Sequence, residues 1–313
     1  MQWFATAPSN IALIKYMGKG AQNVPDNPSL SYTLNHLVTN VMLETHSGHV
    51  DYWEPLLTPG AKPFTLTSQA QSRFLSYFAT LKTHFGYTGG FIVRSCNNFP
   101  HSSGIASSAS SFAALTRCAA MALSELTDTS LPSVETQAQW SRGGSGSSCR
   151  SFFSPWALWD GETVQDITLP YTTLLHQVVM VNHDVKAVLS SEAHRRVRTS
   201  PFYALRGQRA RDNLRLLLSA LNTEDWRSAY DLCWREFQDM HQLFATCEEP
   251  FSYITDATKR VLDMLVALWA REGDGPIVTM DAGPNVHLLY RPDQAEMAQV
   301  FRQTQLLGVY DVL

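Results

Sequence analysis

The sequence predicts an α+β protein made of two domains. Its 313 residues correspond to about two domains of roughly 150 residues each. Strand-like patterns dominate the first fifty residues, long helical patterns come later, and a strand, a turn and a further strand lie near the end. Strands followed by helices and then by strands again are typical of the α+β class. We place the boundary near residue 175 and expect domains at residues 1–175 and 176–313.

The N-terminal half mixes strands, turns and helices. The expected strands lie at residues 11–16, 38–45 and 91–94, and a turn is expected at residues 23–28. The expected helices lie at residues 68–85, 107–126 and 134–140. In the first helix the apolar residues Phe74, Phe78 and Leu81 recur at helical spacing. The second is rich in alanine, which favours a helix that packs closely against its neighbour.

The C-terminal half begins with a β-rich run at residues 177–182. The expected helices that follow lie at residues 210–221, 226–244 and 257–272. Two short strands, residues 277–280 and 286–290, enclose a turn at residues 281–285.

The composition excludes several classes of protein. Asp and Glu number 28 against 24 Lys and Arg, which gives a formal net charge of −4. Such a chain has no strong positive field for nucleic acid, so an anionic ligand needs a local pocket. We find no run of about 18 apolar residues, no signal-peptide pattern and no CxxC pair among the five cysteines. We therefore expect a cytoplasmic protein with reduced thiols and without a nucleic-acid or membrane partner.

A serine-rich loop at residues 100–110, PHSSGIASSAS, runs directly into the alanine-rich helix. A helix N-terminus offers free N–H groups and a partial positive charge, and serine hydroxyls add donors, so a phosphate fits there. An ordinary serine N-cap would give the same pattern. The loop contains neither GxxxxGK[ST] nor GxGxxG, which excludes a Walker A loop and the usual dinucleotide-binding loop.

Five segments in order along the chain carry a family resemblance. They are residues 7–19 (APSNIALIKYMGK), 28–34 (PSLSYTL), 97–109 (NNFPHSSGIASSA), 144–151 (GSGSSCRS) and 281–285 (DAGPN). The third is similar to the PxxxGLxSSA motif of the GHMP kinase superfamily, and the full set resembles the diphosphomevalonate decarboxylase family. The resemblance implies a GHMP kinase fold, with an N-terminal ribosomal-S5-like α/β domain and a C-terminal ferredoxin-like α+β domain. It also implies a homodimer.

The resemblance further implies the residues of the site. The implied ATP-binding residues are Pro100, Ser102, Ser103, Gly104, Ile105, Ala106, Ser107 and Ser108, with Ser107 also contacting Mg²⁺. The implied substrate-binding residues are Tyr16, Lys19, Ser145, Gly146, Ser147, Arg150 and Ser190. The implied catalytic residues are Asp281, Lys15 and Arg150.

Most of these residues also have an ordinary structural interpretation. Two lysines near a strand end, Lys15 and Lys19, usually lie on a solvated surface. Arg150 is able to hold a carboxylate or phosphate with its planar fork, or to form a structural salt bridge. The GSGSS segment would also serve as a flexible linker. An aspartate before Gly-Pro-Asn, such as Asp281, is commonly an Asx-turn residue.

A further segment, residues 186–203, matches the family more loosely. It contains Ser190 and ends in TSPFY, and Arg195, Arg196 and Arg198 would add a positive cluster near Ser190. Taken alone, such a charge run is usually a solvated helix face. The chain departs from the usual family pattern at Met17, where tryptophan is common, at residues 193–194, where Ala-His replaces Gly-Met, and at residues 101–103.

The resemblance implies ATP- and Mg²⁺-dependent decarboxylation of mevalonate 5-diphosphate to isopentenyl diphosphate, in the mevalonate pathway of isoprenoid biosynthesis. The C3 hydroxyl would be phosphorylated first, with Asp281 orienting or deprotonating it. The alternatives are a mevalonate 5-phosphate decarboxylase, a mevalonate 3-kinase and a catalytically silent binding protein of the same fold. Retention of Lys15, Arg150 and Asp281 together favours full decarboxylation.

Overall fold

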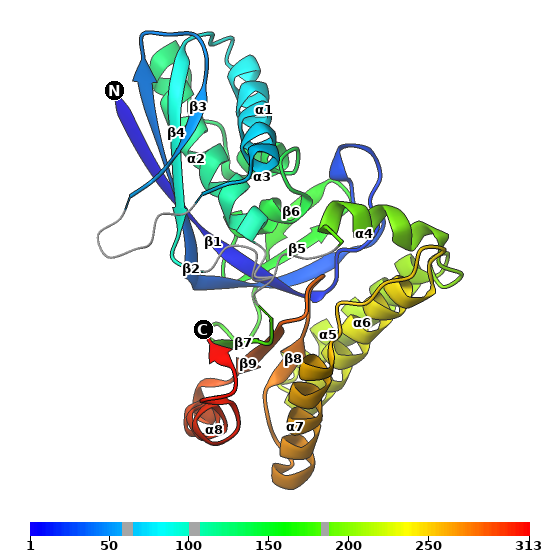
Figure 1. Cartoon of the computed structure of the whole chain (residues 1–313). Coiled ribbons are helices and arrows are strands. Elements are labelled where there is room, and N and C mark those ends of the chain that lie inside the picture. The colour runs from blue at the N-terminus through cyan, green and yellow to red at the C-terminus, as the bar shows by residue number, and fades with distance from the viewer. Residues whose placement is uncertain (58–64, 100–106, 183–187) are drawn as a thin grey trace.

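The computed structural model has two lobes (Figure 1) and describes residues 1–57, 65–99, 107–182 and 188–313. Each lobe is built on its own sheet and carries its own helices. The mixed architecture is the one that the sequence predicts. The last strand of the first sheet ends at Asp166 and the first strand of the second begins at Leu175. The domain boundary after residue 175 stays a prediction.

The first lobe has a mostly antiparallel sheet with helices packed against it. Its strands are β1 (Gln2–Ile14), β2 (Ser29–His46), β3 (Tyr52–Pro55), β4 (Gly90–Asn97), β5 (Trp156–Asp160) and β6 (Thr163–Asp166). In the described residues their order is β3-β4-β2-β5-β6, with β1 paired to β2. The helices are α1 (Ser68–His84), α2 (Ser107–Thr127) and α3 (Val134–Ser141), and α2 packs against β1 and β2.

The second lobe has an antiparallel sheet in the order β10-β7-β9-β8 within the described ranges. Its strands are β7 (Leu175–Met180), β8 (Ile277–Thr279), β9 (Val286–Tyr290) and β10 (Asp311–Val312). Its helices are α4 (Ser190–Arg196), α5 (Arg206–Asn222), α6 (Trp226–Thr246), α7 (Asp256–Glu272) and α8 (Ala295–Phe301). Short helical segments are η1 (Ala21–Asn23), η2 (Gly146–Phe152), η3 (Val197–Thr199), η4 (Pro292–Gln294) and the π-helical η5 (Arg302–Leu306).

The predicted helices in both halves are confirmed, although α5 begins at Arg206 rather than at residue 210. The first predicted strands are much longer than expected, because β1 and β2 form one long antiparallel pair. The strands β3, β5, β6 and β10 and the helices α4 and α8 were not predicted. Most of these elements are short and carry little periodic signal.

The burial pattern of β1 changes along its length. From Gln2 to Pro8 its side chains alternate between buried and more exposed, and from Ser9 to Ile14 every side chain is buried. Alternation indicates one solvated face, whereas continuous burial indicates that both faces are covered. The second half of β1 contacts α5 and α6, and Leu13 belongs to a hydrophobic core that contains residues of both lobes. The first strand therefore joins the two lobes through packing.

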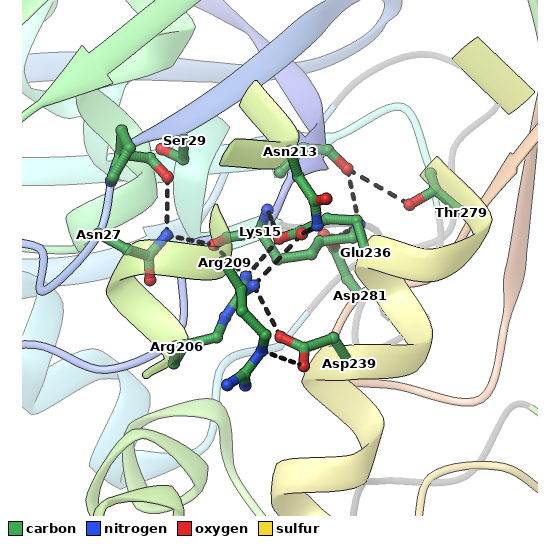
Figure 2. Close-up of polar contacts among 12 residues, drawn as sticks. Lys15, Asn27, Ser29, Arg206, Arg209, Asn213, Glu236, Asp239, Thr279 and Asp281 are labelled. Carbon is green, nitrogen blue, oxygen red and sulfur yellow. Dashed lines mark hydrogen bonds and ion pairs between the residues drawn. The ribbon is translucent and has the colours of Figure 1, made fainter. Parts of the chain in front are cut away.

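A buried ion network also joins the two lobes (Figure 2). Arg206 on α5 and Glu236 on α6 form an ion pair and are 1% and 0% exposed. Asp239 accepts a hydrogen bond from Arg206 at 2.9 Å, and Asn213 donates to Glu236 at 2.8 Å. The backbone N–H of Lys15 donates to Glu236 at 3.0 Å, and Arg206 donates to the Lys15 carbonyl at 3.2 Å. Burial favours the neutral form of Glu236, but the Arg206 guanidinium outweighs it and holds the carboxyl pKa below its usual value.

Replacing Glu236 should destabilise the whole chain. We expect Glu236→Leu to lower the free energy of unfolding by about 3–5 kcal/mol, because the buried Arg206 guanidinium loses its main carboxylate partner. Urea denaturation followed by circular dichroism measures this change. The matched control is Asp231→Leu on the same helix, which removes a half-exposed pair with Arg227 and should change stability by less than about 1 kcal/mol. Equal losses in both variants would contradict a special role for the buried network.

Candidate active site

A cavity of about 370 Å³ is lined by residues of both lobes. The residues that the sequence predicted for the site and that the structure describes all line it: Lys15, Tyr16, Lys19, Ser107, Ser108, Ser145, Gly146, Ser147, Arg150, Ser190 and Asp281. The other predicted ATP-binding residues lie outside the described residues: Pro100, Ser102, Ser103, Gly104, Ile105 and Ala106. The fold thus brings together segments that lie far apart in the sequence, while the individual roles stay predictions.

Lys15 and Asp281 form an ion pair in the cavity wall. The Lys15 Nζ atom lies 2.8 Å from Asp281 Oδ1 and donates to the Ala12 carbonyl at 2.6 Å. Lys15 is fully buried, whereas the Asp281 side chain is 25% exposed. Burial favours the neutral form of Asp281, but the Lys15 ammonium outweighs it and holds the pKa of the carboxyl below its usual value. At neutral pH Asp281 is therefore an ionised carboxylate, which accepts a hydrogen bond or a proton.

The turn that carries Asp281 is held from two helices. His241 on α6 contacts the Asp281 carbonyl at 3.3 Å through Nε2, and Thr258 on α7 donates to the Pro284 carbonyl at 2.9 Å. On the other side Asn285 accepts a hydrogen bond from the backbone of the segment after β7 at 2.9 Å. The Asp281 side chain bonds across the lobe boundary to Lys15, whereas an Asx turn would use it within the turn.

Arg150 is a buried cation with neutral partners. It lies in η2, is 3% exposed, and donates to Ser29 Oγ at 2.8 Å and to Asn10 Oδ1 at 3.3 Å. Its guanidinium also lies over the Trp159 ring, 5.8 Å from the centroid. A buried guanidinium whose hydrogen bonds go to neutral groups favours an anionic ligand, and a planar fork suits a carboxylate or phosphate.

The glycine- and serine-rich segment is an ordered part of the cavity wall. A Cβ atom at Gly146 would lie 2.4 Å from the Tyr16 hydroxyl, so the close approach of Tyr16 requires glycine there. The Ser108 and Ser145 hydroxyls lie 3.1 Å apart, and Ser148 donates to the Ser145 carbonyl at 2.6 Å. These contacts exclude the flexible-linker interpretation of GSGSS.

One end of the cavity gathers further donors. Lys19 donates to Asn23 Oδ1 at 2.6 Å, and burial together with the charge of Arg73 lowers the Lys19 pKa. Arg73 on α1 lines the cavity and donates to the Gly144 carbonyl at 2.5 Å. Sequence reasoning missed Arg73, because a lone arginine in a helical pattern is usually a solvated residue. It noted His194 only as a departure from the family pattern, yet this residue lines the same cavity.

The three arginines that follow Ser190 in the chain pair with carboxylates, and Arg195 and Arg198 lie on the solvated surface. Arg195 and Arg196 both pair with Glu192, at 2.5 and 2.7 Å. Arg198 pairs with Asp26 at 3.3 Å. Glu249 also lies 3.1 Å from Arg196, so Glu192, Glu249 and Asp26 together offset the charges of the three arginines.

The described residues offer no cluster of three His, Cys, Asp or Glu side chains that would hold a metal ion. Mg²⁺ commonly takes one or two protein ligands together with substrate phosphates and waters. The Ser107 side chain at the cavity fits such a partial site, in which phosphate oxygens supply most of the coordination. Among the helices that the structure describes, none combines the length and the apolar character needed to cross a bilayer.

Removing the Lys15 charge should raise the pKa of Asp281. In Lys15→Met the ammonium is lost while burial remains, so the Asp281 pKa should rise, although the charges of His287 and Arg150 still act to lower it. A carbon-13 NMR titration of the Asp281 carboxyl carbon in aspartate-labelled protein measures the shift. Lys259→Met is the control, since Lys259 is exposed and pairs with Asp256 outside the cavity. An unchanged Asp281 titration in Lys15→Met would contradict the assigned electrostatic role.

Comparisons with known proteins find the same family along both halves of the chain. The diphosphomevalonate decarboxylase-like N-terminal domain matches residues 7–168, and the mevalonate 5-diphosphate decarboxylase C-terminal domain matches residues 177–306. The diphosphomevalonate decarboxylase of Debaryomyces hansenii is 28% identical over 97% of this chain and 81% of its own. A mevalonate diphosphate decarboxylase from Legionella pneumophila is 58% identical, with a TM-score of 0.95 and full coverage of both chains.

A structure of MDDEF in complex with MVAPP, AMPPCP and magnesium is 26% identical, has a TM-score of 0.86, and is matched over 100% of this chain and 96% of its own. The family models, the relatives and the solved structures thus agree on one family. The chain belongs to the diphosphomevalonate decarboxylase family.

Proposed function

We propose that this chain catalyses the ATP-dependent decarboxylation of mevalonate 5-diphosphate to isopentenyl diphosphate, ADP, phosphate and carbon dioxide. The main observation is that the ionised Asp281 and the buried Arg150 line one cavity in a chain of this family. A related structure holds MVAPP, AMPPCP and magnesium together, which supports a site for substrate, ATP and Mg²⁺. A homodimer is a further proposal that rests on the family resemblance. A cytoplasmic location is another, supported by the five cysteines, none of which forms a disulfide.

Asp281 acts in the first step, in which the γ-phosphoryl group of ATP is transferred to the C3 hydroxyl. A tertiary hydroxyl is a poor leaving group, and phosphorylation converts it into phosphate. Because its pKa is low, Asp281 orients the hydroxyl and accepts the proton only as the new O–P bond forms. Lys15 keeps Asp281 ionised and places a positive charge beside the transferring group.

Arg150 acts in the second step by holding the substrate carboxylate. The bond between C3 and oxygen breaks, and its electron pair leaves with phosphate. The bond between C2 and the carboxyl carbon then breaks, and its electron pair forms the C2=C3 double bond as carbon dioxide departs. A guanidinium with neutral protein partners is suited to fix the carboxylate until this point.

The remaining donors bind the phosphate groups. Lys19, Tyr16 and the segment 145–147 would contact the 5-diphosphate, and the loop up to Ser108 would contact ATP. Ser107 would hold Mg²⁺ together with phosphate oxygens, and the ion neutralises charge on the transferring phosphoryl group.

The reaction itself is tested by measuring both products. We expect purified protein with ATP, Mg²⁺ and mevalonate 5-diphosphate to release carbon dioxide and ADP in equal amounts. Formation of ADP without carbon dioxide would indicate a mevalonate 3-kinase, and a higher kcat/KM on mevalonate 5-phosphate would indicate the monophosphate enzyme. Formation of neither product would indicate a silent binding protein.

Asp281→Asn tests the proposed base. We expect kcat to fall by about 10²–10⁴-fold, because the amide cannot accept the hydroxyl proton, while nucleotide and substrate binding change little. Calorimetric titration with each ligand separates binding from turnover. The control Asp256→Asn changes an exposed aspartate on α7 and should keep the kcat of the unmodified protein. A near-normal kcat in Asp281→Asn would rule out this role.

A further inference from the structure

His194 on α4 presents an imidazole ring to the same cavity. It is 7% exposed, and its ring lies 4.5 Å from the Tyr16 ring, measured between centroids. The backbone N–H of Gly18 donates a hydrogen bond to His194 Nδ1 at 3.0 Å. Gly18 has a φ of +95° and precedes Lys19, so the ring is fixed against the segment that carries Lys19.

The hydrogen bond from Gly18 sets the tautomer of His194. A backbone N–H only donates, so Nδ1 must be the unprotonated acceptor and the ring hydrogen must lie on Nε2. Burial and the charge of Lys19 also lower the His194 pKa to about 3, which keeps the ring neutral. Nε2–H is then the remaining polar group of a side chain that lines the cavity.

The neighbours of His194 make this end of the cavity suitable for an anion with several oxygens. Lys19 donates to the side-chain oxygen of Asn23, and Arg73 donates to a backbone carbonyl. The hydrogen-bond acceptors of both cations are therefore neutral groups. Lys19 is close enough to lower the His194 pKa, and Arg73 lowers that of Lys19. All three side chains line the same cavity and offer N–H donors.

We propose that His194 donates a hydrogen bond from Nε2–H to the 5-diphosphate of the substrate and determines its preference over the 5-monophosphate. The proposal rests on the proposed function, because it names a substrate group for the same cavity. A diphosphate has more acceptor oxygens than the donors of Lys19 and the segment 145–147 can satisfy alone. A neutral donor binds these oxygens without adding a third cation to Lys19 and Arg73.

Binding measurements without ATP test the proposal independently of turnover. Calorimetric titration with mevalonate 5-diphosphate and mevalonate 5-phosphate would compare the unmodified chain with His194→Phe and His194→Gln. We expect His194→Phe to lose about tenfold or more in affinity for the diphosphate, the value for one hydrogen bond to a charged group, and less than about threefold for the monophosphate. His194→Gln keeps an N–H donor and should recover part of the loss. His49→Phe, at an exposed histidine outside the cavity, is the matched control.

Equal losses for both ligands in His194→Phe would overturn the proposal and indicate that His194 only positions Gly18 and Tyr16. Unchanged affinities would overturn it as well. Failure of the unmodified chain to bind mevalonate 5-diphosphate would instead contradict the proposed function. Should His194→Phe fail to fold, nitrogen-15 NMR of the unmodified protein decides. The Nε2 signal of His194 must then move on addition of mevalonate 5-diphosphate, and an unchanged signal overturns the proposal.

Discussion

The backbone N–H and carbonyl of Lys15 both form hydrogen bonds with side chains of the second lobe. Its N–H donates to Glu236, and its carbonyl accepts from Arg206, which forms a buried ion pair with Glu236. A peptide group that is buried outside a sheet needs such partners. Separating Glu236 from Arg206 would leave each of these charges buried without compensation. The same residue directs its ammonium at Asp281. The position of the first strand against α5 and α6 and the ionisation of the cavity carboxylate therefore depend on one residue.

The charge of the whole molecule says little about its cavity. The chain carries a formal charge of −4, yet Lys15, Lys19, Arg73 and Arg150 line one hollow in which Asp281 is the acidic residue among the described ones. Asp281 is matched by Lys15, and the protein partners of the other three cations are neutral groups. In a cavity with low-dielectric walls these charges act over short distances on a bound anion. Several arginines outside the cavity, by contrast, pair with carboxylates, as Arg196 on α4 does with Glu249.

The sequence was informative wherever a pattern is local. Helical spacing predicts α1, and the alanine-rich segment predicts α2 because small side chains pack closely. The segments that carry Lys15, Arg150 and Asp281 were recognisable because their motifs are continuous. Residues that act through tertiary contacts left no such signal. Arg206 and Glu236 are single charged residues in helices and look solvated until α5 and α6 meet β1. Arg73 and His194 reach the cavity only through the packing of α1 and α4.

The core shared by both lobes also constrains the synthesis of the chain. Leu13 and Ile11 pack in a cluster with residues of α5 and α6. The Lys15 backbone forms hydrogen bonds with Glu236 and Arg206, which are synthesised much later. At roughly 5–20 residues per second, a ribosome reaches those helices on the order of ten seconds or more after it has made β1. During that interval β2 already pairs with the first strand, but the apolar side chains of α5 and α6 and the Glu236 acceptor for the Lys15 N–H are missing. The nascent first lobe therefore exposes a hydrophobic strand, which is the kind of surface that chaperones bind.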